Sequence, residues 1–444
     1  MIWKQKNRHK PSPNLPRHPP LRSTENPLDL PAEESFAVAS DGWPAWPPKH
    51  AKLTRQIEKS VAEVLEDGQW GTYPETTAAK SEQVGVYERC RNSVSLAAGK
   101  WSAPEGITAF GGTAQVRLCP SGSSAIELAL RALGVGPAGA KRSKATQVIL
   151  SAYDYPGNFR TVELLGGRPV LCDTQPTSGT RSGRTSTGIL PSLKSIQQIQ
   201  APPESILLVS HLHGQLADSG GLAELCRQRR WFLVEDACQA MGAGRIKQNA
   251  DGSTVFVPVG YFAEWTTYSF GGSKPLTCGN GGALVTEYEG KYQKLKGMVD
   301  RPSDTFPMSP LQCAALMPQL DWLSQLNRIR CQNAQRLSDL DWASVGCAAV
   351  WDEDPSLVRA PYKFPVLAKN AETRAKVIQQ LRTIELPCGE GFRAMHRTSD
   401  RRSSKPVSLK NAAALSESLL VIDHRALLTP DVAERVAGCL SKMS

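Results

Sequence analysis

A regular alternation of short apolar strands and helical segments, between about residues 110 and 290, constrains the fold more than any other feature of the sequence. The predicted strands are 147–151, 168–172, 205–210, 231–236 and 283–286, and the predicted helices between them are 124–133, 158–165 and 221–229. Alternation at this spacing favours an α/β domain with a mostly parallel sheet. In such sheets, functional groups gather at the carboxyl ends of the strands.

The character of the chain changes on both sides of this region. Residues 1–38 are polar, basic and rich in proline, which predicts a disordered tail. We predict a large α/β domain over residues 39–319 and a smaller α+β domain over residues 320–444. The other predicted elements are a helix at 53–65, a hairpin turn at 247–253, a long helix at 320–340, a strand at 362–367 and a helix at 371–384.

Composition excludes some classes of protein and leaves others open. The 11 cysteines form no closely spaced pairs, so we predict reduced thiols in a cytoplasmic protein and no metal site. No apolar run is long enough to span a bilayer, and we expect no membrane association. The net charge of +10 leaves a nucleic-acid-binding protein as one alternative. Because much of this charge lies in the tail, we predict no nucleic-acid partner.

Three features in chain order indicate a catalytic site. Ser121-Gly-Ser-Ser124 opens a predicted helix, and backbone amides at a helix N-terminus can bind a phosphate. Asp236 ends an apolar strand, where a carboxylate can face a cationic ring nitrogen. Lys274 lies between two pairs of glycines in Gly271-Gly-Ser-Lys-Pro-Leu-Thr-Cys-Gly-Asn-Gly-Gly282. Each feature alone also fits an ordinary cap, acid or solvated lysine, but their order suggests a pyridoxal phosphate (PLP) site.

The motifs resemble the DegT-type family of PLP-dependent sugar and cyclitol aminotransferases, over roughly residues 43–440. The segments that carry the resemblance are Gly122-Ser-Ser124, His211-Leu-His-Gly-Gln215, Val234-Glu-Asp-Ala-Cys-Gln-Ala-Met-Gly-Ala243 and Ser273-Lys-Pro-Leu-Thr-Cys-Gly-Asn-Gly-Gly282. The last segment, with Trp70 and His424, is most similar to the branch of scyllo-inosose aminotransferases and 3-amino-5-hydroxybenzoate synthases. The resemblance implies the aspartate-aminotransferase-like fold, with a seven-stranded type of sheet in the large domain.

The resemblance also implies roles for individual residues. Lys274 would carry the cofactor as a Schiff base and move protons during catalysis, and Asp236 would pair with the pyridine nitrogen. Gln239 would hydrogen-bond the phenolic oxygen of the ring, and Tyr155 would stack on the ring. The predicted phosphate ligands are Gly122, Ser123, Ser124 and Ser269.

Some positions depart from the family pattern. Asn280 replaces a usual acid, and Thr305 and Pro307 stand where the family has Asn and Arg. The family asparagine reaches the cofactor phosphate of a partner subunit, so a homodimer is expected, while this cross-subunit contact is put in question. Residues 91–112 form a longer connection than the family usually has there, and we interpret them as an insertion. We expect residues 91–112 and 177–188 to select the amino acceptor.

The predicted activity is transfer of an amino group from glutamate or glutamine to a keto-sugar or keto-cyclitol. PLP-dependent sugar dehydratases of the same fold have histidine in place of the lysine, and Lys274 argues against that group. The alternative is a regulatory or otherwise non-transaminating protein of the PLP fold, which the departures at Asn280, Thr305 and Pro307 leave open.

Overall fold

A computed structural model describes residues 36–68, 70, 85–99, 102–111, 114–137, 144–176, 184–185, 188–249, 251–299, 307–352 and 354–443. From Phe36 onward the chain forms one compact unit. Almost all of the predicted tail, Thr305 and most of the loop at 177–188 lie outside the described residues. None of the described helices is long and apolar enough to cross a membrane.

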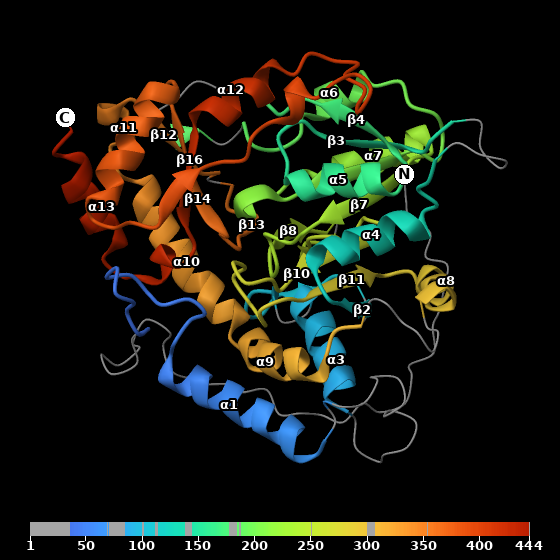
Figure 1. The fold of residues 1–444 in the computed structure, drawn as a ribbon, viewed down its shortest axis with the longest axis horizontal. Coiled ribbons are helices and arrows are strands. Elements are labelled where there is room, and N and C mark those ends of the chain that lie inside the picture. Colours follow the sequence, from blue (N-terminus) through green and yellow to red (C-terminus); the bar gives the residue numbers. More distant parts are fainter. Residues whose placement is uncertain are drawn as a thin grey trace. The chain divides into compact units, whose positions relative to one another are not determined.

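The elements follow one another as shown in Figure 1. The helices are α1 (Ala51–Glu66), α3 (Val86–Ala98), α4 (Gly122–Ala132), α5 (Pro156–Leu164), α6 (Leu193–Gln197), α7 (Ser219–Arg229), α8 (Glu289–Val299), α9 (Pro310–Asp321), α10 (Leu323–Ser338), α11 (Ala371–Arg382), α12 (Lys410–Ser418) and α13 (Val432–Leu440). The strands are β1 (Thr108–Ala109), β2 (Gln115–Cys119), β3 (Gln147–Ser151), β4 (Arg168–Cys172), β5 (Arg184–Thr185), β6 (Ile206–Ser210), β7 (Phe232–Asp236), β8 (Gly244–Gln248), β9 (Thr254–Pro258), β10 (Trp265–Ser269), β11 (Gly282–Thr286), β12 (Cys347–Val350), β13 (Leu357–Val358), β14 (Lys363–Ala368), β15 (Cys388–Glu390) and β16 (Leu419–Asp423).

The central sheet has seven strands in the order β2-β11-β10-β7-β6-β3-β4. Its neighbouring strands are parallel, except that β11 runs antiparallel to both β10 and β2. Strands β2, β3, β6, β7 and β10 therefore end at the same edge of the sheet. The predicted α/β class and mostly parallel seven-stranded sheet are confirmed.

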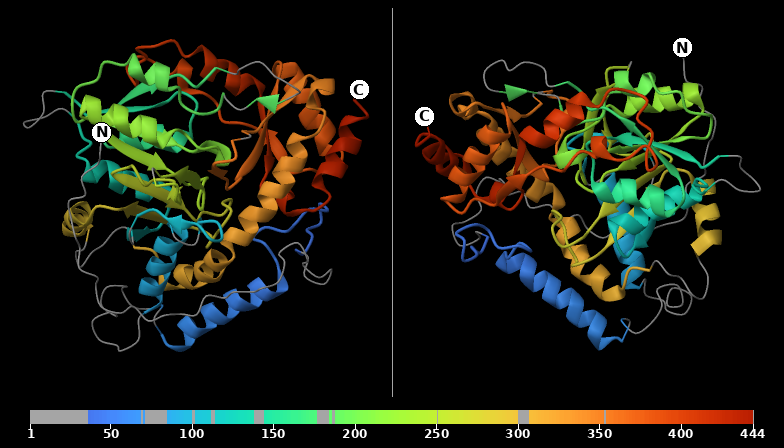
Figure 2. Two further views of the ribbon diagram at one scale, coloured as in Figure 1. Left: turned by 180° about the vertical axis from the view of Figure 1, so that it is seen from behind. Right: turned by 45° about the horizontal axis from the view of Figure 1, so that its top comes forward.

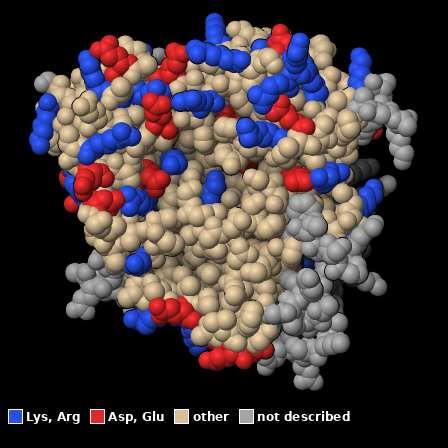
Figure 3. Space-filling model, viewed as in Figure 1, with Lys and Arg blue, Asp and Glu red and all other residues tan. Residues whose placement is uncertain are grey.

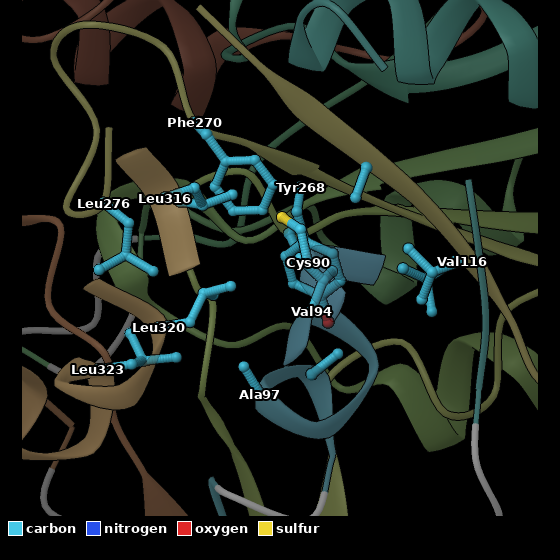
Figure 4. Packing of buried hydrophobic residues seen from close by; sticks show 14 of the residues in the cluster. Cys90, Val94, Ala97, Val116, Tyr268, Phe270, Leu276, Leu316, Leu320 and Leu323 are labelled. Atoms are coloured by element: carbon cyan, nitrogen blue, oxygen red, sulfur yellow. The ribbon is translucent and has the colours of Figure 1, made fainter. Parts of the chain in front are cut away.

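Helices cover both faces of this sheet because its strands are apolar on both sides. On one face, Leu150 and Leu208 pack with α4 and α5. On the other face, Ile149 and Leu207 pack with α6 and α7, while Leu118 packs with α3 and α9. Figure 4 shows part of this last cluster, in which Phe270 and Leu276 from the loop after β10 approach Leu316 and Leu320 of α9.

Two smaller sheets complete the unit. A five-stranded sheet, β15-β16-β14-β12-β5, packs with α10, α11 and α13 through residues such as Phe364 and Ile422. A four-stranded sheet, β1-β9-β8-β13, contains the predicted hairpin, whose turn lies between β8 and β9. Figure 2 shows α10 leading from α9 to the side of the five-stranded sheet. The predicted domain boundary near residue 320 stays a prediction, because residues 36–444 group as one unit.

The prediction of one long helix over residues 320–340 is wrong. The structure has two helices, and α9 begins at Pro310 and ends at Asp321, where Trp322 separates it from α10. The start of α9 is set by a capping box, in which the Ser309 hydroxyl accepts from the backbone of Gln312 and the Gln312 side chain accepts from the backbone of Ser309. Helix α9 packs against α1, whereas α10 packs against α13.

Candidate active site

The candidate site lies where five strands of the central sheet end. Ser121 and Gly122 follow β2, Tyr155 follows β3, and Ser210 is the last residue of β6. Asp236 ends β7 and Ser269 ends β10. The parallel arrangement brings these positions to one edge of the sheet, which is where open α/β sheets bind their ligands.

Asp236 is almost fully buried, at 6% exposure, and is held by several donors. Its Oδ2 accepts from Asn158 Nδ2 at 2.8 Å, and its Oδ1 accepts from the backbone N–H of Cys238 at 3.0 Å. The hydroxyls of Ser210 and Thr267 lie farther from it, at 3.4 and 3.5 Å. Each oxygen of the Asp236 carboxyl group therefore has one close donor, and these donors fix its orientation.

A second carboxyl, Asp154, is fully buried close to Asp236. Its Oδ1 accepts from the backbone N–H of Tyr155 at 2.6 Å, while its Oδ2 has no hydrogen-bond partner among the described residues. Burial raises the pKa of Asp154 to about 8; the Ser210 hydroxyl opposes this shift and the charge of Asp236 adds to it. Asp154 therefore has fewer close donors than Asp236 to stabilise a negative charge.

Lys274 lies on a loop that is held in place by residues distant from it in the sequence. The Trp46 indole donates to the carbonyl of Gly272 at 2.8 Å, and His424 Nε2 donates to the carbonyl of Ser273 at 3.1 Å. The carboxamide of Gln319 binds both the N–H and the carbonyl of Thr277, at 3.0 and 2.7 Å. Burial lowers the pKa of His424 to about 3, so its ring is neutral. These contacts fix the loop that presents the lysine.

Asn280, where the family has an acid, is tied to the start of α9 through its backbone. Its carbonyl accepts from Gln312 Nε2 at 2.5 Å, which ties the loop to the start of α9. Pro307 precedes this capping box in the chain, and Thr305 lies outside the described residues. The predicted cross-subunit contact therefore stays untested.

The turn before α4 packs closely against the end of β10. A Cβ atom at Gly122 would lie 2.7 Å from Ser269 Cβ and 3.1 Å from Cys238 Sγ, so only glycine fits there without movement. Ser121 caps α4 by accepting from the N–H of Ser124 at 3.0 Å. The exposed Ser123, the partly buried Ser124 and Ser269 thus surround a helix N-terminus, which is a suitable place for a phosphate.

A hydrogen bond joins the side chain of Gln239 to the backbone of His213. The carboxamide oxygen of Gln239 accepts from the backbone N–H of His213 at 2.8 Å, so its NH₂ group stays available to donate. His213 has a left-handed backbone with φ of 59°. Burial lowers its pKa to about 3, and the charges of Lys363 and Lys274 add to this effect. A neutral histidine thus replaces the family's aromatic residue in the His211–Gln215 segment.

Aromatic rings surround this side of the site. Phe392 stacks on His213 with ring centres 5.5 Å apart, and Tyr155 meets Phe392 edge-on at 6.0 Å. The Tyr153 hydroxyl accepts from the backbone N–H of Phe392 at 3.0 Å and lies 3.3 Å from His213 Nε2. Tyr155 is 42% exposed, which leaves its ring accessible to a ligand.

Sequence reasoning located part of this site and missed the rest. The structure brings Gly122, Ser124, Tyr155, Asp236, Gln239 and Ser269 to one edge of the sheet. The residues missed include Asp154, Asn158, Ser210 and Tyr362. The strand-end rule that identified Asp236 could also have identified Ser210 and Asp154, since both lie at or just after the end of a predicted strand.

These residues fit a pyridoxal phosphate. The close-packed turn at Gly122 offers a phosphate site, and Asp236 offers a buried, hydrogen-bonded carboxylate for a ring nitrogen. Lys274 supplies the amine, and its charge and that of Asp236 both act on the Cys238 thiol, whose pKa burial holds well above its usual value. Among the described residues, no group of three His, Cys, Asp or Glu side chains could hold a metal ion.

The fold and this arrangement of lysine, carboxylate and helix N-terminus define a protein of the PLP-dependent transferase fold. The sequence profile of the DegT/DnrJ/EryC1/StrS aminotransferase family matches residues 104–441. The chain therefore belongs to this family of PLP-dependent aminotransferases.

Individual relatives are more distant. The chain is 28% identical to GDP-perosamine synthase of Caulobacter vibrioides over 40% of its own length and 41% of that protein. It is 27% identical to L-glutamine:2-deoxy-scyllo-inosose aminotransferase of Streptomyces fradiae, over 68% of this chain and 66% of the relative. The matches thus span about two fifths and two thirds of these relatives' lengths.

Among solved structures, 3-amino-5-hydroxybenzoic acid synthase has the same fold. It superposes with a TM-score of 0.69 at 22% identity, covering 91% of this chain and 100% of the other. At this identity the likeness supports the fold and leaves the substrate open.

Proposed function

We propose that this protein is an aminotransferase that moves an amino group from glutamate or glutamine to a keto-sugar or keto-cyclitol. The observation that carries the proposal is the placement of Lys274 and Asp236: the lysine lies on the loop after β10, and β10 pairs in parallel with β7, which ends at Asp236. The membership of the aminotransferase family and the similarity to the inosose aminotransferase support the choice of reaction.

Each residue would have a defined task. Asp236, fixed by Asn158 and the Cys238 amide, would hold a proton at the ring nitrogen of the cofactor. When bound, pyridoxal phosphate supplies an electron sink that stabilises negative charge at the donor's α-carbon. The Lys274 amine would remove the proton from that carbon and return it during the second half of the reaction.

The other residues would position the cofactor. Gln239 keeps its NH₂ group available for the phenolic oxygen, because its carboxamide oxygen is already bonded to His213. The turn at Gly122, with Ser123, Ser124 and Ser269, would bind the phosphate. Tyr155 would contact a ring face, since it is braced edge-on by Phe392 and is still accessible.

We also propose a homodimer. Figure 3 shows charged side chains gathered toward the top of the view and a broad area with few charges below them. The buried core of a protein–protein interface is depleted of charged residues, so this area is where we expect the partner subunit to pack. Sedimentation velocity of the purified protein tests this, and a monomer at micromolar concentration would contradict it.

The activity is tested in single turnover. Protein loaded with pyridoxal phosphate is mixed with glutamate or with glutamine, and conversion of the cofactor to pyridoxamine phosphate is followed by absorbance. Keto-sugars and keto-cyclitols are then screened for reversal of the change. Lys274→Ala should bind the cofactor, but borohydride reduction should not link the cofactor covalently to the protein. This variant should also lose turnover. A wild-type protein that binds the cofactor but converts it with neither donor would favour the regulatory alternative.

A further inference from the structure

Two buried carboxyl groups, Asp154 and Asp236, share the same neutral neighbours. The Asn158 carboxamide donates to Asp236 Oδ2 at 2.8 Å and lies 3.4 Å from Asp154 Oδ1. It also contacts the Ser210 hydroxyl at 3.0 Å, and this hydroxyl lies near both carboxyls. Within the described part of the chain, neither carboxyl forms an ion pair with a lysine or arginine.

Two carboxylates in such a place cannot both be charged without a large free-energy penalty. One proton therefore stays on the pair, and the hydrogen bonds decide which carboxyl carries it. Asp236 has a close donor on each oxygen, whereas Asp154 Oδ2 has none among the described residues. The proton belongs on Asp154 Oδ2, the oxygen that no donor reaches, and Asp236 keeps the charge.

We propose that Asp154 is a positioning residue that holds one proton beside Asp236 and thereby adjusts the negative charge facing the cofactor ring. This inference rests on the proposed function for the role of Asp236. A bound ring cation offsets the charge of Asp236, so Asp154 then loses its proton more easily. The pair therefore carries one negative charge near neutral pH without cofactor, and with cofactor bound it gains the second charge at a lower pH than without it.

Other titratable groups face Asp154 from neighbouring elements. Cys172, on β4, and Tyr153, in the turn after β3, both have their pKa raised by burial, and the charge of Asp154 adds to each shift. Both are therefore neutral near neutral pH. Asp236 on β7 is the facing group that carries charge.

The first test uses the protein without cofactor. Asp154 has a raised pKa in the folded state, so its contribution to stability is full below the unfolded pKa and is lost as pH rises toward about 8. The melting temperature of Asp154→Asn, relative to wild type, should therefore rise steadily from about pH 5 to about pH 8 and then level off. A difference that stays constant with pH would overturn the proposal.

Two further variants make this test specific. Asp251→Asn removes an exposed carboxyl at the hairpin turn, and its difference from wild type should not vary over this pH range. Asp236→Asn removes the charge that helps to keep Asp154 protonated. In that background, the midpoint of the Asp154 titration should move to lower pH, and an unchanged midpoint would overturn the coupling between the two carboxyls.

The second test uses 4′-deoxypyridoxine 5′-phosphate, a ring compound that cannot bond to Lys274. Its dissociation constant is measured for wild type and for Asp154→Asn from about pH 6 to about pH 9.5. Titration of the ligand affects both proteins equally, so it cancels in the ratio of the two dissociation constants. Wild type should gain affinity relative to the variant by roughly tenfold as pH rises, which corresponds to a pKa change of about one on binding. A ratio independent of pH would overturn the link to the cofactor.

The two tests separate this inference from the proposed function. If wild type does not bind the analogue, the proposed function fails together with the cofactor half of the inference. The carboxyl pair itself is then still decided by the melting temperatures of the cofactor-free variants.

Discussion

The Lys274 amine lies 4.7 Å from the centre of the Tyr362 ring, which is stacked in turn on His424 with ring centres 5.6 Å apart. The lysine comes from the loop after β10, and the tyrosine immediately precedes β14 of the five-stranded sheet. A ring face attracts a cation, so this contact helps to position the Lys274 side chain.

Removing the Tyr362 ring should weaken the hold on the Lys274 side chain. A cation–π contact contributes about 0.5–1 kcal/mol. In a double-mutant cycle of Tyr362→Leu and Lys274→Met, the coupling free energy, measured by urea unfolding without cofactor, should be about that amount. Tyr362→Phe retains the ring and should keep the coupling with Lys274; a coupling free energy of zero for Tyr362→Leu would contradict the contact.

Gly122→Ala should impair cofactor binding. The added methyl group would lie against Ser269 and Cys238, and forcing an atom into such a packed place costs about 1–3 kcal/mol. We expect lower thermal stability and an affinity for pyridoxal phosphate reduced at least tenfold, measured by fluorescence titration. Gly438→Ala, where a Cβ meets nothing within 4 Å, should leave the affinity unchanged and raise stability by up to about 1 kcal/mol.

His424 should make the protein sensitive to acid. Its pKa is lowered to about 3 by burial, so its contribution to stability is present above the unfolded pKa of about 6.5 and is lost as pH falls toward about 3. At about pH 5.5 the loss is on the order of 1 kcal/mol. His424→Gln should therefore lose less stability than wild type between about pH 8 and about pH 5.5, as measured by urea unfolding. Parallel losses in both proteins would contradict a buried neutral His424.

Trp46→Phe should weaken the hold on the lysine loop. It removes the hydrogen bond to the Gly272 carbonyl while keeping a ring against His424, at a cost in stability of about 1 kcal/mol. Because the loop presents Lys274, the affinity for pyridoxal phosphate should fall as well.

The matched control for this change is Trp43→Phe. It removes a similar hydrogen bond, from the Trp43 indole to the carbonyl of Ile384, at a place outside the lysine loop. Stability should fall by more than in Trp46→Phe, because Trp43 is fully buried and the smaller ring leaves a cavity, while cofactor affinity stays the same. If both variants lose affinity equally, the effect comes from general destabilisation.

The sequence predicted those features that depend on local patterns. The strand ending at Asp236 and the strand at 147–151 were predictable because apolar runs of this length are characteristic of buried strands. Lys274 was identified from its glycine-rich surroundings and the family resemblance. These signals lie within a few residues of the groups they locate.

The remaining features depend on contacts between distant segments. Asn158 reaches Asp236 across 78 positions, and His424 reaches Ser273 across 151, so no local pattern records either contact. The break at Trp322 is similar, because its side chain bonds to Gln56 on α1, which is far away in the sequence. By contrast, the capping box at Ser309 was a readable local signal for the start of α9.

Trp46 and His424 together form a clamp on the lysine loop, and this clamp can close only after both residues have been synthesised. One of these residues, Trp46, is synthesised before the central sheet, and the other, His424, is synthesised after it. A nascent chain that has already completed the strands of the central sheet still lacks half of the clamp. Stable capture of the cofactor should therefore wait until His424 has been synthesised, and a chain ending just before β16 should fold its central sheet yet hold the cofactor poorly.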